Sequence, residues 1–134
     1  MNGDLHVTRQ FYEYRNFSNL YTLEYDRAKA EEGIRALGAN DIRSYKDLEF
    51  QELSKVLTNL AKELRANSLA GKKTFVYFQY GGHGTLDGYT YAICNSEKKN
   101  KVRFPLEKIL RSIAKISNTY MLAVFDCCRE KMVE

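Results

Sequence analysis

The chain has 134 residues, the size of one ordinary domain, and its 44% hydrophobic and 28% charged residues are typical of a globular protein. Its net charge of +4 is spread along the sequence, and the densest basic stretch, Lys98 to Arg103, is interpreted as a solvated loop, so we expect no nucleic-acid partner. The longest apolar run, Tyr120 to Phe125, is six residues, far short of the ~20 that cross a bilayer. We therefore expect one folded domain with no membrane partner.

The first half of the chain predicts two helices joined by a short strand. Apolar residues fall on one helical face from Leu23 to Leu37, and Gly38 follows where a helix ends in a left-handed cap. Residues 41–46 are interpreted as a short strand. Asp47 is the expected N-cap of the second helix, whose apolar residues recur at intervals of three and four from Phe50 to Leu64.

The second half alternates strands with one more helix. A strand over 74–80 is apolar at four consecutive positions, which predicts cover on both faces, and it stops at a Gly-Gly-His-Gly turn. A tyrosine-rich strand over 89–94 follows, and Pro105 opens a third helix that ends near Asn118. The last strand, 119–125, runs into Asp-Cys-Cys-Arg. This alternation predicts an α/β domain with a mostly parallel sheet.

The three cysteines, Cys94, Cys127 and Cys128, are odd in number with two of them adjacent, a pattern that does not suit a disulfide framework. The opening residues also lack the features of a secretory signal. Both observations predict a reducing, cytoplasmic compartment, in which the thiols are free for chemistry or packing.

Candidate chemistry lies in two loops, each expected where a buried strand stops. His83 follows one strand and the Cys127–Cys128 pair follows another, so neighbouring parallel strands would bring both loops to the same sheet edge. A histidine with its ordinary pKa of ~6.5 can accept a thiol proton and later protonate a leaving amine. His83 and Cys128 therefore predict a base and a nucleophile, and the N–H groups of Gly84 and Cys128 an oxyanion hole.

Plainer readings of the same residues stay open. Gly-Gly-His-Gly is also a common flexible turn, and most free cysteines are small buried hydrophobic residues. A zinc site from His83, Cys127 and Cys128 would lack a fourth ligand at a usual spacing. We therefore predict no metal ligand.

The segments FVYFQYGGHG (75–84) and YMLAVFDCCRE (120–130) resemble the histidine and nucleophile strands of caspase-like cysteine proteases. His83 and Cys128 are 45 residues apart, close to the ~50 of the caspase signature. The resemblance is clearest over 16–130. It implies a three-layer α/β fold, with a mostly parallel sheet and helices on both faces, and a cysteine endopeptidase that acts on protein or peptide substrates.

The resemblance places the general base on His83, an oxyanion-hole amide on Gly84 and the nucleophile on Cys128. Two residues before the nucleophile, aspartate-cutting caspases have glutamine, whereas metacaspases and paracaspases have aspartate. Here that residue is Asp126, which implies cleavage after arginine or lysine. A buried structural carboxylate is the alternative for Asp126. No cofactor is expected, and calcium is implied by the metacaspase resemblance alone.

The sequence also departs from the family at both ends. Residues 1–15 offer only Leu5 and Val7 among scattered aromatic residues, so the first strand is predicted to be degenerate or missing, and the acidic residue that follows it in metacaspases has no match. The chain ends six residues after Cys128, so we expect a partial domain, cut after the nucleophile strand. Such a domain would self-associate through an exposed sheet edge and show negligible activity alone. A catalytically inactive interaction or signalling module is the alternative function.

Overall fold

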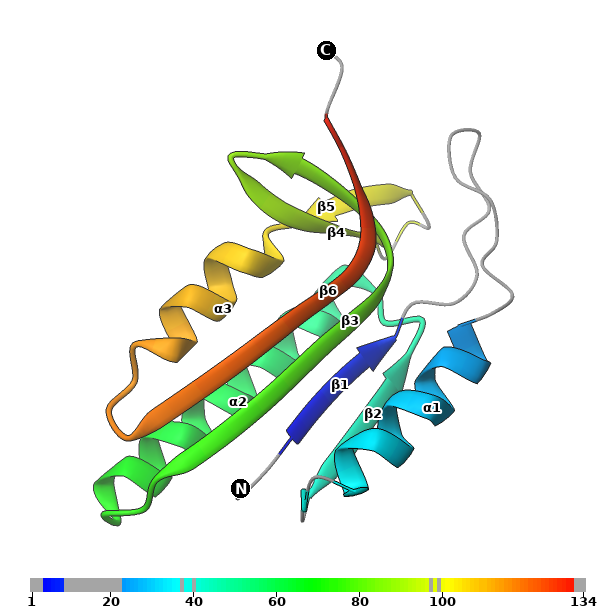
Figure 1. Ribbon diagram of the computed structural model, residues 1–134. Helices are drawn as coiled ribbons and strands as arrows, with labels where there is room; N and C mark the ends of the chain where they lie inside the picture. Colours follow the sequence, from blue (N-terminus) through cyan, green and yellow to red (C-terminus); the bar gives the residue numbers. More distant parts are fainter. Residues whose placement is uncertain are drawn as a thin grey trace.

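The computed structural model describes residues 4–8, 23–36, 38–39, 41–96, 98 and 100–131. Figure 1 shows the elements around one sheet. In chain order they are β1 (Asp4–Thr8), α1 (Leu23–Ala36), β2 (Ile42–Lys46), α2 (Phe50–Leu69), β3 (Thr74–Asp87), β4 (Tyr89–Asn95), β5 (Lys101–Phe104), α3 (Leu106–Ala114) and β6 (Thr119–Lys131). None of the described helices combines the length and apolar character needed to cross a membrane.

The six strands form one sheet in which β3 is the central strand. The order is β2-β1-β3-β4-β5. Strands β1 and β4 pair with successive parts of one edge of β3, residues 78–81 and 84–87, and β6 pairs with the opposite edge. Strands β2, β1, β3 and β6 run parallel, whereas β4 and β5 pair in antiparallel fashion after β3. The predicted α/β class with a mostly parallel sheet is therefore confirmed.

Two successive residues of β2 contact helices on opposite sides of the sheet. The Arg43 guanidinium donates to the Glu63 carboxylate of α2 at 2.6 Å, and the next side chain, Ser44, donates through its hydroxyl to Glu31 of α1. Successive strand residues point to opposite faces, so α1 and α2 lie on opposite sides. In Figure 1, α2 lies behind the sheet and α1 lies in front of β2, and α3 packs into the same core as α2, which gives the expected three layers.

The core lies between the sheet and the pair α2 and α3. Its members alternate along β3 and recur at helical spacing in α2, as the periodicity of the sequence predicts. The largest fully buried side chains are Leu53, Leu57, Leu64, Phe78, Tyr80, Phe104 and Leu106.

The opposite face of β3 and β6 is largely uncovered near the start of both strands. Phe75 is 39% exposed, its register partner Tyr120 is 53% exposed, and Leu122 is 51% exposed. The prediction that this strand is covered on both faces is therefore wrong here: no described helix covers these side chains.

The first strand, predicted to be degenerate or missing, is present. Residues 4–8 form β1, which pairs with β2 on one edge and with residues 78–81 of β3 on the other. Hydrogen bonds to two neighbouring strands stabilise this short segment. Because these bonds join backbone groups, the strand needs no apolar run that a sequence pattern could reveal.

Two smaller expectations also need correction. Asp47 has a positive φ of 53°, and the N-cap of α2 is Glu49, whose N–H donates to the Glu52 carboxylate at 2.9 Å in a capping box. The basic stretch ending at Arg103 is a loop only in part, because Lys101–Phe104 forms β5 against β4. The left-handed conformation expected of Gly38 is confirmed by its φ of 94°.

Candidate active site

His83 and Cys128 are register partners in the parallel pairing of β3 with β6. Directly paired residues of parallel strands share a face of the sheet, so these two positions are neighbours on one face. The expectation that the two strands are adjacent is confirmed. The expectation that both residues sit in loops is wrong, since β3 continues to Asp87 and β6 to Lys131. The ladder continues through Gly81 and Gly82 because β6 pairs with both residues.

The two adjacent cysteines occupy opposite faces of the sheet. Cys127 is half-buried and packs against the core cluster, on the same side as Met121, Ala123 and Phe125. Cys128 takes the next position, on the face of His83. The register therefore places position 128 opposite His83, and the alternation puts the Cys127 side chain on the other face of the sheet.

A buried tyrosine fixes the backbone at His83. The Tyr80 side chain is 0% exposed, and its hydroxyl donates a hydrogen bond of 2.8 Å to the carbonyl oxygen of His83. Gly82, between them, has a φ of 152°, a conformation that L-residues with a side chain rarely adopt. Tyr80 was not among the predicted site residues. The signal available was a tyrosine, with its polar hydroxyl, as the last residue of an apolar strand before Gly-Gly-His.

Asp126 lies beside a glycine on the face of His83. Its register partner is Gly81, two positions before His83, just as Asp126 is two positions before Cys128. Asp126 is exposed. Because Gly81 has no side chain, the neighbouring strand places no group beside the Asp126 carboxylate on this face.

Gly84 has a strand on each side. It pairs with Ala92 of β4 and with Arg129 of β6, and it is buried. A strand residue directs its N–H toward a neighbouring strand. The Gly84 amide can therefore reach a substrate only where one of these two ladders opens.

Two titratable groups with displaced pKa values lie outside this site, and both hold elements together. The hydrogen bond to Asp41, followed by that to Glu63, raises the pKa of Arg43 above its ordinary value. The backbone N–H of Thr90 and then the Arg111 guanidinium lower the pKa of Glu107. Arg43 joins β2 to α2, and Glu107 joins α3 to β4.

The acidic residue that follows the first strand in metacaspases would fall within residues 9–22, outside the described residues.

Comparison with protein families decides the class of the domain. The model of the caspase domain matches residues 10–134. The chain belongs to the caspase-domain family. This membership gives it a cysteine-protease type of domain and agrees with the fold described above. A search of curated proteins found no match.

Proposed function

We propose that this caspase domain is a cysteine endopeptidase of the metacaspase and paracaspase type, with Cys128 as nucleophile and His83 as general base. The observation that carries the proposal is the register pairing of these residues on one sheet face. Thiol and imidazole are the two groups that covalent peptide hydrolysis requires as neighbours. The odd number of cysteines further favours a cytoplasmic setting, where a nucleophilic thiol stays reduced.

The proposed reaction has two steps. His83 accepts the proton of the Cys128 thiol, and the sulfur attacks the peptide carbonyl carbon to form a C–S bond. The C–N bond then breaks, and the amine leaves with the proton from His83. A water molecule, deprotonated by His83, hydrolyses the thioester to release the acid and restore the thiol.

The N–H groups of Gly84 and Cys128 are proposed to stabilise the oxyanion of each tetrahedral intermediate. Since Gly84 is paired with both Ala92 and Arg129, this role requires the ladder to open at Gly84 when a substrate enters. The end of β6 is the simpler segment to release, because β6 pairs with β3 alone among the described strands.

Asp126 is proposed to select basic residues before the scissile bond. Its carboxylate is exposed, on the same face as Cys128, and its partner Gly81 leaves space for a long substrate side chain. Arginine or lysine would place its charge against this carboxylate, whereas a substrate aspartate would be repelled.

The deciding experiment measures the reactivity of the Cys128 thiol and does not depend on turnover. In a Cys127→Ala background, Cys94 and Cys128 are the remaining cysteines, and Cys94, 0% exposed, is the internal control. Iodoacetamide labelling at neutral pH is followed by mass spectrometry. We expect Cys128 to react much faster than Cys94, and His83→Ala to slow Cys128 alone. Equal rates with and without His83 would overturn the assigned pair.

Turnover provides the second readout, measured with arginyl fluorogenic peptides. Cys128→Ala and His83→Ala should abolish it, because without thiolate or base the acyl-enzyme cannot form. Cys127→Ala should retain activity and lower the free energy of unfolding by about 1 kcal/mol through lost core packing. Activity that survives in Cys128→Ala would refute the nucleophile. If His83→Ala leaves the labelling rate of Cys128 unchanged and the folded protein cleaves no peptide, the inactive interaction module is the better assignment.

A further inference from the structure

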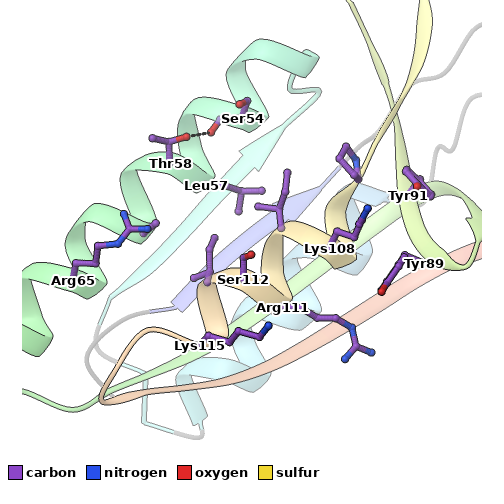
Figure 2. Close-up of a pocket in the computed structure, with 14 residues that line it drawn as sticks. Ser54, Leu57, Thr58, Arg65, Tyr89, Tyr91, Lys108, Arg111, Ser112 and Lys115 are labelled. Carbon is purple, nitrogen blue, oxygen red and sulfur yellow. Dashed lines mark hydrogen bonds between the residues drawn. The ribbon is translucent and has the colours of Figure 1, made fainter.

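A groove of about 840 Å³ lies between α2 and α3, on the side of the sheet opposite the His83 and Cys128 positions (Figure 2). Its floor is aliphatic, with Leu57 and Ala61 of α2 and Ile109 and Ile113 of α3, and Tyr89 and Tyr91 of β4 line one end. Three of these, Leu57, Ala61 and Ile113, are buried at 2%, 7% and 5% exposure and belong to the core. The groove floor is therefore part of the folded core.

Cationic side chains line both sides of this groove. Arg65 comes from α2, and Lys108 and Lys115 come from α3 and the residue after it. Figure 2 shows Arg65 and Lys115 toward one end and Lys108 toward the other, near Tyr89 and Tyr91. None of the described residues that line the groove carries a carboxylate. The groove is thus apolar at its floor and positive along its sides.

The described part of the chain offers these three charges no ion-pair partner. Among the described residues, no carboxylate pairs with Arg65, Lys108 or Lys115, whereas Arg111 on the same helix is paired with Glu107 at 2.8 Å. A cation at the C-terminal end of a helix is favourable in itself, which accounts for Lys115. It does not account for Arg65, which lies before the last turn of α2, and Lys108 contacts the Tyr89 ring at 5.5 Å.

We propose that this groove binds an acidic peptide segment of a partner protein, with leucine-like side chains on the floor and carboxylates on Arg65, Lys108 and Lys115. The nine residues of α3 make the groove about 13 Å long, enough for about four extended residues. A peptide is favoured over a nucleic acid because the floor is aliphatic and the two rings that line the groove are already covered by cations. Lys108 lies over Tyr89 at 5.5 Å and Arg103 over Tyr91 at 4.9 Å.

The proposal is independent of the proposed peptidase mechanism. The sheet separates the groove from the face that carries His83 and Cys128, so a bound segment would not occupy the position of a substrate under attack. It would hold a partner or the distal part of a substrate on the domain.

The experiment is a fluorescence-anisotropy titration of a fluorescein-labelled peptide of alternating glutamate and leucine, at low salt. Two double variants carry the same change in charge. Arg65→Glu with Lys115→Glu alters the groove, and Lys55→Glu with Lys62→Glu alters exposed positions of α2 that do not line it. We expect the groove variant to weaken binding about tenfold or more, and the control by less than about twofold. Should the groove variant unfold, as judged by circular dichroism, Arg65→Gln with Lys115→Gln replaces it.

Three comparisons complete the test. A peptide with glutamine for glutamate should bind at least about tenfold more weakly, and one with serine for leucine should also lose affinity. Equal losses in both double variants would reduce the effect to diffuse charge attraction and overturn the proposal. The proposal would also be overturned if the wild type did not bind the acidic peptide. It would be overturned as well if a labelled RNA oligonucleotide bound more tightly than the peptide and the groove variant abolished that binding.

Discussion

The hydroxyl of Tyr80 and the carbonyl of His83 are joined by a hydrogen bond of 2.8 Å that spans the Gly81-Gly82 segment of β3. Tyr80→Phe removes this bond and keeps the ring. We expect the free energy of unfolding to fall by about 1 kcal/mol. We also expect kcat to fall by about tenfold or more with little change in KM, because the imidazole loses its fixed position. Urea unfolding and steady-state kinetics measure the two effects.

Tyr77→Phe is the matched control for Tyr80→Phe. Its hydroxyl donates to the Gln79 side chain at 3.1 Å, on the face opposite the core, and it does not reach the His83 backbone. This variant should leave kcat unchanged. A loss of kcat as large as that of Tyr80→Phe would remove the positioning role assigned to Tyr80.

Asp126 should determine the charge preference of cleavage. In the wild type, arginyl peptides should be cut faster than aspartyl peptides. Asp126→Asn should reduce that preference about tenfold, because a charge-assisted contact becomes a neutral one. The ratio of kcat/KM for the two peptides is the measurement. Faster cleavage of aspartyl peptides by the wild type would contradict the assignment to the metacaspase and paracaspase type.

Glu107 should make stability depend on pH in the acid range. Hydrogen bonds from the Thr90 N–H and Arg111 lower the pKa of this carboxyl in the folded state. A lowered folded pKa means that the ionised carboxylate stabilises the fold above its unfolded pKa, and that this stability is lost as pH falls through the folded pKa. Wild type should therefore exceed Glu107→Gln in stability at pH 6–7, and the difference should shrink below about pH 4.

Glu32→Gln is the control for the acid titration, since Glu32 forms an exposed pair with Lys29 at 3.6 Å. Exposed pairs contribute little, so this variant should follow the wild type from neutral pH into the acid range. A difference between wild type and Glu107→Gln that stays constant down to pH 3 would show that the carboxylate charge is not the cause.

The chain on its own should self-associate along β6. This strand is 13 residues long, pairs with β3 alone among the described strands, and carries the exposed Leu122. Lysine on an edge strand opposes pairing with a second chain, so Leu122→Lys should shift the protein toward monomer in size-exclusion chromatography. Leu69→Lys alters a residue that is 91% exposed at the end of α2 and should not. A wild type that elutes as a uniform monomer would contradict this prediction.

Local patterns predicted the parts of the fold in which burial is periodic. The three-and-four spacing from Phe50 to Leu64 predicted α2, and the apolar runs after residues 73 and 118 predicted the starts of β3 and β6. Two neighbouring parallel strands were then enough to predict that His83 and Cys128 meet, because the sheet aligns the same ends of both strands.

The remaining features depend on contacts between segments distant in the sequence. β1 is stabilised by ladders on both sides and has no apolar pattern of its own. The continuation of β3 through Gly81 and Gly82 depends on β6 alongside, since glycine by itself predicts a turn. The Tyr80 bond requires the backbone geometry at Gly82, which no residue pattern encodes.

The adjacent cysteines would keep a cysteine opposite His83 even if the two strands were misaligned by one residue. If β6 slipped by one residue along β3, Cys127 would take the place of Cys128 beside His83, and a thiol would still stand next to the imidazole. The same slip would turn Met121, Ala123 and Phe125 away from the core, at a cost of several kcal/mol in lost burial. Both alignments place a cysteine opposite His83, so the need for a thiol there does not determine the register. The apolar, core-facing residues of β6 therefore determine which cysteine lies opposite His83.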